Sequence, residues 1–462
     1  MPVADRPPSA PAWRAGGRPA PHGPARFELS QRGHRMAQPR HESGQGKRSL
    51  RSAGRGHGRR CTGWMTQIAA SETGMNGQGR DNKAKVVVAE TGGARDRIWY
   101  ARGWDGMPLA ASLQLLAKNR FAIAPSRLGM ALVVLALGPF NSLLATVQRI
   151  VYGRRIERTA IRQGPVFILG HWRSGTTLLH ELLALDPEHT YPTTYDCFAP
   201  SHFLVSASFL PALVKHVTPR RRPMDSMAFG LQRPQEDEFA LCNLGVPSPY
   251  WMIAFPNRRP QQLEYLTLEG LSLEARRRWQ QTFIWFLRCL TCREPKRLVL
   301  KSPPHTARLR VLLSLLPDAR FIHIVRDPYV LFPSTLTLWK RLFRQQGFQV
   351  PREEGLEELV FETLVRMYEA FERDRPLVPP GHLCEVRYER LVAEPAAQLE
   401  RIYRELDLGP FDRVRPGAER YLAERADYRP NRYEISDHTR QLIRRRWAAY
   451  IERYGYGTTV GA

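Results

Sequence analysis

The stretch VFILGHWRSGTTLLHELL at residues 166–183 decides how this chain is organised. It begins with a short apolar run at 166–170, which is typical of a buried strand. A Gly/Ser-rich turn follows, and an amphipathic helical pattern then covers 177–185. Such a turn directs successive backbone N–H groups and the positive end of a helix at one point, so this stretch favours a bound phosphate group.

The same alternation of strand and helix continues to the end of the chain. Apolar runs at 298–301, 321–325 and 384–388 predict further buried strands. Helical patterns cover 275–289, 307–316, 329–343, 356–372 and 395–406. Strands that alternate with helices predict a three-layer α/β/α fold with a mostly parallel sheet, and the strand–loop–helix start makes it P-loop NTPase-like.

The loop departs from the nucleotide-binding pattern G-x-x-x-x-G-K-[ST] at one position. Gly170 and Gly175 have the right spacing and Thr177 takes the Ser/Thr place, but Thr176 stands where the lysine belongs. The cation comes instead from Arg173 inside the loop. A threonine cannot cover the β- and γ-phosphates of ATP, so the loop argues against ATP hydrolysis. A P-loop nucleotide kinase or NTPase stays the alternative interpretation of this loop.

Charge is concentrated at the beginning of the chain. The 462 residues hold 69 Lys+Arg and 44 Asp+Glu, a net charge of +25, and residues 1–64 account for 13 of the basic and 3 of the acidic residues. We expect residues 1–95 to form a disordered basic tail, 96–163 a helical region and 164–455 the catalytic domain. An excess held in a tail argues against a nucleic-acid-binding protein and predicts no nucleic-acid partner, although a basic membrane-surface protein stays an alternative.

Residues 128–147 form an apolar segment without a charge, which Arg127 and Arg149 flank. Its length just suffices to span a bilayer. We expect Gly138 and Pro139 to break it into two pieces. The segment fits a spanning helix, an interfacial or re-entrant helix, or a helix packed on the catalytic domain. No apolar region follows the first basic residues, so we expect a cytoplasmic protein with membrane association on the cytoplasmic face.

Cysteine usage favours neither a disulfide framework nor a metal site. Cys289 and Cys292 have zinc-ribbon spacing, but no second ligand pair follows at a suitable distance. We expect two buried thiols at the end of a helix and no metal.

A second phosphate motif lies about 150 residues after the first. The run RFIHIVRDP at 320–328 is a strand that ends in Arg326, followed by a helix start at Asp327 and Pro328 and then by Ser334. A guanidinium binds phosphate through two parallel hydrogen bonds, and a hydroxyl near a helix start adds another donor.

Together the motifs resemble those of sulfotransferases that use 3′-phosphoadenosine 5′-phosphosulfate (PAPS), in particular the bacterial branch with the loop GHWRSGTTLLH. The resemblance implies in-line sulfuryl transfer to a hydroxyl or amine without a metal. It places the 3′-phosphate at Arg326 and at Ser334, eight residues later, and it places Tyr388 of the YERL run near the nucleotide. The residues implied to cradle the 5′-phosphosulfate are Arg173, Ser174, Gly175, Thr176 and Thr177.

The resemblance also implies the acid–base residues. Members carry a lysine and a histidine after the strand that ends here at Lys301, and the spacing to His305 is longer than usual. Lys301 would stabilise charge on the leaving phosphate oxygen and His305 would deprotonate the acceptor. The segment PQEDE at 234–238 resembles P-x-E-D-E of the same branch, so Glu236 or Asp237 is an alternative base, alone or with His305.

The acceptor side is less defined. A small molecule, a lipid or a glycan all fit, and the 128–147 segment favours a lipid. The aromatic stretch 246–256 either lines an acceptor pocket or packs as a loop. Two departures from animal members stand out: Leu178 replaces a tryptophan, and the C-terminal R-K-G loop is absent, for which residues 429–433 are the expected substitute.

Overall fold

The computed structural model describes residues 102–214, 230–258, 261–424 and 433–457. The predicted tail at 1–95 lies outside these residues, as do residues 429–432 of the expected substitute loop.

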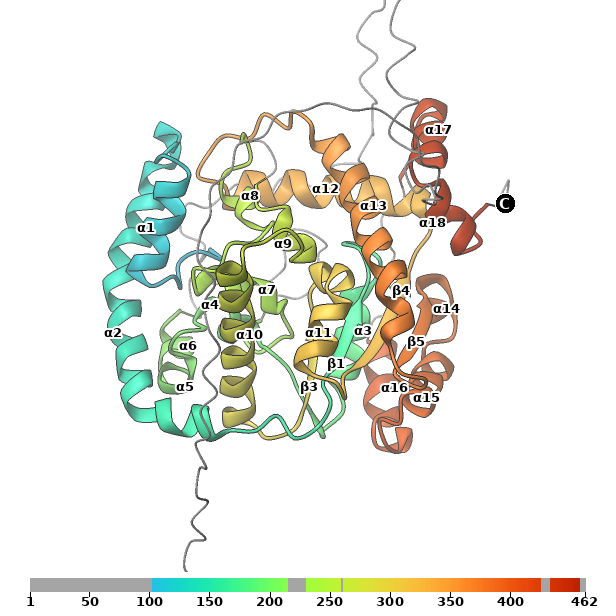
Figure 1. The fold of residues 1–462 in the computed structure, drawn as a ribbon, viewed down its shortest axis with the longest axis horizontal. Helices are drawn as coiled ribbons and strands as arrows, with labels where there is room; N and C mark the ends of the chain where they lie inside the picture. The colour runs from blue at the N-terminus through green and yellow to red at the C-terminus, as the bar shows by residue number, and fades with distance from the viewer. Residues whose placement is uncertain (1–101, 215–229, 259–260, 425–432, 458–462) are drawn as a thin grey trace, which may run out of the picture. The chain divides into compact units, whose positions relative to one another are not determined.

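The described residues contain one five-stranded sheet in the order β2-β3-β1-β4-β5, in which all paired neighbours are parallel (Figure 1). The strands are β1 (Val166–Leu169), β2 (His189–Thr190), β3 (Arg297–Lys301), β4 (Arg320–Val325) and β5 (Leu383–Arg387). The four predicted strands are confirmed, whereas β2 was not predicted because two residues carry no apolar pattern. The later strands are added on both sides of β1, so the strand order reverses direction there. Ligands bind at such a reversal of strand order in open α/β sheets.

Alternate residues of each strand face opposite layers of helices, since side chains alternate across a strand. Phe167 and Leu169 pack in one core with α10 (Leu273–Arg293) and α11 (Leu309–Leu315). Val166 and Ile168 pack in another core with α3 (Thr176–Leu183), α15 (Pro395–Glu405) and α16 (Arg415–Ala423). The three-layer α/β/α prediction is therefore confirmed.

The predicted helices are also present, with shifted ends. The Asp327 carboxylate accepts the Tyr329 N–H at 2.8 Å and starts α12 (Pro328–Gln346), which is followed by α13 (Leu356–Asp374). The remaining α-helices are α4 (Thr194–Phe198), α5 (Phe203–Ser206), α6 (Leu210–Val214), α7 (Asp237–Asn243), α8 (Trp251–Ala254), α9 (Glu264–Thr267), α14 (Tyr388–Ala393), α17 (Asp437–Arg446) and α18 (Ala448–Arg453). Short 3₁₀ turns lie at η1 (Pro125–Arg127), η2 (Pro303–Ala307), η3 (Arg375–Leu377) and η4 (Phe411–Arg413).

The apolar segment belongs to one continuous helix, α2 (Leu128–Arg158), which packs beside α1 (Leu109–Lys118) at the left of Figure 1. The predicted break at Gly138 and Pro139 is wrong. Contact with α1 explains the continuity: a Cβ on Gly138 would lie 2.9 Å from Leu109 Cα, and the Leu109 N–H donates to Ser142 Oγ at 3.0 Å. Among the described helices, the stretch Pro125–Arg158 is long and apolar enough to cross a membrane by length and composition.

Candidate active site

The phosphate loop is held in shape by its own hydrogen bonds. The Gly170 N–H donates to Thr306 Oγ1 at 2.8 Å, and both the N–H and the hydroxyl of Ser174 donate to the His171 carbonyl, at 3.1 and 2.8 Å. Helix α3 begins at Thr176, so its first N–H groups have no carbonyl of their own helix to bind. The predicted strand–loop–helix geometry is present.

Gly175 sits where no other residue fits. Its φ is +105°, and a Cβ there would lie 2.3 Å from Cδ2 of Tyr388. The ring of Tyr388, which comes from the first turn of α14, therefore packs directly on the loop. The structure thus brings together Gly175 and Tyr388, two residues that sequence reasoning placed near the same nucleotide.

The two phosphate motifs meet in space. Arg173 Nε donates to Ser334 Oγ at 3.0 Å, and Arg326 Nη1 donates to the Arg173 carbonyl at 2.8 Å. The Arg326 guanidinium also lies 4.1 Å from the centre of the Tyr388 ring. Tyr433, the described end of the expected substitute loop, donates to Ser334 Oγ at 3.4 Å. Two cations and a hydroxyl from distant parts of the chain therefore share one site.

Lys301 lies between the loop and the acidic segment. Its Nζ is 2.6 Å from Glu236 Oε1 and 3.5 Å from Thr177 Oγ1. The Lys301 side chain is almost fully buried, whereas Glu236 keeps 16% of its side-chain surface exposed. This places a carboxylate and an ammonium group next to the first turn of α3.

Each residue of the acidic triplet, Glu236 to Glu238, pairs with a separate cationic or imidazole group from residues 301–308. Asp237 Oδ2 lies 2.6 Å from His305 Nε2, and Asp237 Oδ1 accepts the Ser302 hydroxyl at 3.0 Å. Glu238 accepts two hydrogen bonds from Arg308, at 2.6 and 3.0 Å. All three acidic side chains therefore bind to the end of β3 and the segment that follows it.

The three candidate bases differ in exposure. The side chains of Asp237 and His305 have 0% exposed surface. The His305 ring packs edge-on to Phe167, with 5.4 Å between ring centres, and its Nδ1 has no hydrogen-bond partner within the described residues. Burial acts to raise the pKa of Asp237, but His305 and the Ser302 hydroxyl outweigh it and lower that pKa. Of these three groups, the Glu236 carboxylate is the one that solvent reaches.

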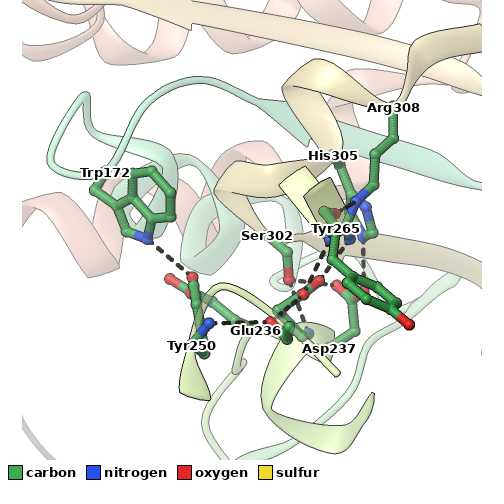
Figure 2. A network of polar contacts seen from close by, with 10 residues as sticks. Trp172, Glu236, Asp237, Tyr250, Tyr265, Ser302, His305 and Arg308 are labelled. Atoms are coloured by element: carbon green, nitrogen blue, oxygen red, sulfur yellow. Dashed lines mark hydrogen bonds and ion pairs between the residues drawn. The ribbon is translucent and has the colours of Figure 1, made fainter. Parts of the chain in front are cut away.

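The sequence placed Tyr250 in the aromatic stretch but did not connect it, or Trp172, with Glu236. The Tyr250 hydroxyl donates to Glu236 Oε2 and accepts the Trp172 indole N–H at 2.9 Å (Figure 2). Burial, and then the Glu236 charge, raise the pKa of Tyr250 well above its usual value. Trp251, which begins the short helix α8, and Phe255 of the same aromatic stretch are buried, so these two side chains belong to the protein core. An aromatic run carries no periodic signal that separates these roles.

The prediction of two buried thiols at the end of a helix is confirmed. Cys289 and Cys292 are buried free thiols near the end of α10. Across the described ranges, no group of three or more His, Cys, Asp or Glu side chains is arranged to hold a metal ion.

Comparison with known proteins gives the family. A family model described as "Sulfotransferase family" matches residues 165–413. The chain is 45% identical over 363 residues to the omega-hydroxy-beta-dihydromenaquinone-9 sulfotransferase Stf3 of Mycobacterium tuberculosis, a match that covers 79% of this chain and 93% of the relative. The chain belongs to the sulfotransferase family. It is therefore a transferase, and the resemblance of the phosphate loop is confirmed.

Other sulfotransferases share the fold. Superposition on the solved sulfotransferase STF9 of Mycobacterium avium gives a TM-score of 0.54 at 19% identity, covering 76% of this chain and 97% of that one. STF1 of Mycobacterium tuberculosis gives 0.52 at 18% identity, covering 74% and 91%. The nodulation protein NoeE of Sinorhizobium fredii is 25% identical over 261 residues, which cover 55% of this chain and 52% of NoeE.

Proposed function

We propose that this sulfotransferase transfers the sulfuryl group of PAPS to the hydroxyl of an isoprenoid lipid, with Glu236 as the base. Family membership gives the reaction class, while the donor, the acceptor and the residue roles are our proposals. The observation that carries the donor is the convergence of Arg173, Arg326 and Ser334 beside the phosphate loop.

The donor fits the charges of the site. The N–H groups at the start of α3 and the Arg173 and Lys301 side chains suit a 5′-phosphosulfate, because they gather positive charge at the end of β1. Arg326 and Ser334 suit the 3′-phosphate, and Tyr388 lies beside both parts of the site. A ligand with two separate anionic groups would give each of these two arginines a counter-charge.

We assign the base to Glu236 on the ground of exposure. The Glu236 carboxylate would take the proton of the acceptor hydroxyl, whose oxygen then forms a bond to sulfur as the bond from sulfur to the phosphate oxygen breaks. The products are the sulfate ester, 3′-phosphoadenosine 5′-phosphate and the proton held by Glu236. This chemistry needs no metal, because cationic side chains stabilise the departing phosphate.

Lys301 links the base to the donor. Its ammonium group contacts both Glu236 and Thr177, so a bound phosphosulfate would draw it from the carboxylate to the leaving oxygen. Donor binding would then release a lone pair of Glu236 for the acceptor. His305 and Asp237, being buried, act in this proposal as positioning residues that hold the start of α7 against β3.

The acceptor assignment rests on the relative that is 45% identical over 93% of its length and that is named for an omega-hydroxy-dihydromenaquinone. We infer an acceptor of the same class, a hydroxyl on an isoprenoid chain.

The five cysteines in the described part of the chain are free thiols, which supports a cytoplasmic enzyme.

Calorimetry tests the donor. We expect wild-type protein to bind 3′-phosphoadenosine 5′-phosphate far more tightly than ATP, and Arg326→Ala to weaken that binding by tenfold or more, which is about 1.4 kcal/mol. Arg366→Ala, which removes an exposed arginine of α13, is the matched control and should leave the affinity unchanged. Equal affinity for the two nucleotides would refute the donor assignment.

Transfer of radiolabelled sulfate from PAPS to a hydroxylated isoprenoid quinol tests the base and the acceptor. We expect Glu236→Gln to lower kcat by about 10²- to 10⁴-fold while nucleotide affinity stays within twofold of wild type. His305→Gln should weaken folding but retain measurable kcat in the folded fraction. A large loss of kcat in His305→Gln, with kcat retained in Glu236→Gln, would assign the base to His305. If wild-type protein that binds the nucleotide forms no labelled lipid, the proposed acceptor class is refuted.

A further inference from the structure

Helix α2 has an inverted distribution of polarity over its first half. The large side chains that face solvent there are apolar, with Leu132 64% and Leu143 62% exposed, and Leu128, Val133, Leu137 and Phe140 are exposed beside them. No charged residue interrupts this face between residues 128 and 143, which at 1.5 Å per residue is about 24 Å of helix. A soluble surface helix normally presents the opposite pattern, with polar residues outward.

The two amide side chains of α2, Asn141 and Gln148, point into the protein. Asn141 Nδ2 donates to the carbonyls of Asp105 and Met107 at 2.8 and 3.1 Å. Gln148 Oε1 accepts the Leu204 N–H at 2.8 Å. Both side chains are buried, so the helix is fixed to the domain by hydrogen bonds to backbone groups of neighbouring segments.

These contacts decide between the orientations that length and composition allow. A helix that crossed the bilayer would need lipid or other helices around its whole circumference, and the Asp105, Met107 and Leu204 backbone groups would lose their partners. A helix that lies in the plane of the membrane surface keeps every one of these contacts. Only its outward face then needs an apolar neighbour.

Basic residues surround the apolar face. Residues 118–158 contain seven Lys or Arg and one acidic residue, a net charge of +6. Lys118 and Arg120 precede the apolar face along the chain, and Arg149, Arg154 and Arg158 follow it, all with exposed side chains. Each such residue near an anionic bilayer contributes about 1 kcal/mol of attraction.

An exposed aromatic residue, Phe121, lies in the turn between α1 and α2. Arg120 and Phe121 both have positive φ, at 53° and 50°, which is unfavourable for residues with a Cβ. The turn leaves Phe121 55% exposed. Exposure of this ring to water is unfavourable, and its burial at the boundary of a bilayer would be favourable.

From these observations we propose that α2 and Phe121 form a membrane-docking face that seats the enzyme on an anionic lipid bilayer, with α2 in the plane of the surface. The inference does not depend on which acceptor the enzyme uses, although a lipid acceptor would be met at that same surface.

Co-sedimentation of the full chain with vesicles tests the proposal. Wild-type protein should bind vesicles of phosphatidylcholine and phosphatidylglycerol, bind phosphatidylcholine alone more weakly, and dissociate as salt is raised. The double variant Leu132→Glu, Leu143→Glu should reduce partitioning by about tenfold or more. Leu377→Glu, which places one such charge on an exposed leucine of η3, is the control and should bind as wild type does.

Two further measurements separate the outcomes. Sulfation of a short-chain, water-soluble acceptor should be unchanged in the double variant, which shows that the fold and the site are intact. Membrane-bound protein should be released by an alkaline carbonate wash. Retention after that wash would overturn the in-plane placement. The docking face would be overturned if the double variant bound vesicles as well as wild type does. It would also be overturned if wild-type protein did not bind vesicles and the double variant differed from it in oligomeric state.

Discussion

The ion pair between Glu238 and Arg308 makes a strong prediction about stability. Both side chains have 0% exposed surface, and two hydrogen bonds of 2.6 and 3.0 Å join them. Arg308 also donates to the Tyr265 carbonyl and lies 5.0 Å from the centre of the Trp279 ring. Glu238→Gln would leave the guanidinium charge buried without a counter-charge.

The expected cost follows from that burial. Removal of one partner of a buried pair destabilises a protein by about 3–5 kcal/mol, because the remaining charge is uncompensated. Replacement of both partners by apolar residues of similar size is often neutral. We therefore expect Glu238→Gln to lose about 3–5 kcal/mol, and Glu238→Leu with Arg308→Met to recover most of that loss.

Urea denaturation at constant m-value measures both variants. Arg366→Ala breaks the exposed i,i+4 pair with Glu362 and serves as the control, with an expected cost of about 0.5 kcal/mol or less. A loss below about 1 kcal/mol for Glu238→Gln would refute the reasoning, because water or another group would then be compensating Arg308.

Two further predictions concern the loop and the pH dependence of stability. Gly175→Ala should weaken nucleotide binding by tenfold or more in calorimetry, since its Cβ would collide with Tyr388 at a φ of +105°; unchanged affinity would show that the loop yields. Burial lowers the pKa of His171 to about 4, and that of His202 likewise. Because the folded pKa lies below the unfolded value near 6.5, this stability is complete above pH 6.5 and declines toward pH 4, at about 1.4 kcal/mol per pH unit for each histidine. The urea midpoint should therefore decrease as the pH is lowered from 7 to 5. A midpoint that stays constant over that range would contradict the lowered pKa values of the two histidines.

The sheet could be predicted because its strands are short apolar runs that helical patterns separate. Val166 to Leu169 is buried at every position, so its sequence is uninterrupted by polar residues. Strand β2 was missed because His189 and Thr190 are buried polar residues held by their neighbours, which leaves no pattern to detect. The continuity of α2 through Pro139 was also missed, because contact with α1 rather than local preference decides it.

Site residues could be predicted where a sequence motif fixes the backbone. They were harder to predict where the burial of a side chain decides its role. Arg173 and Ser334 were assigned from separate motifs and lie 3.0 Å apart. The pairing of the acidic triplet was not foreseen, although residues 301, 305 and 308 have helix-like spacing opposite three consecutive acids. The different exposure of Glu236 and His305 could not be predicted from the sequence, because neither residue lies in a segment with a periodic apolar pattern.

The strand order also sets the spacing of the donor site. Lys301 ends β3 and Arg326 follows β4, and these two strands flank β1, so one cation lies on each side of the loop. Neighbouring strands are about 4.8 Å apart, so the backbones of β3 and β4 are held about two strand spacings from each other. Substitutions in the surrounding core cannot change that distance without breaking the sheet. Divergence among enzymes built this way should therefore accumulate outside the proposed donor site, while that site keeps its dimensions.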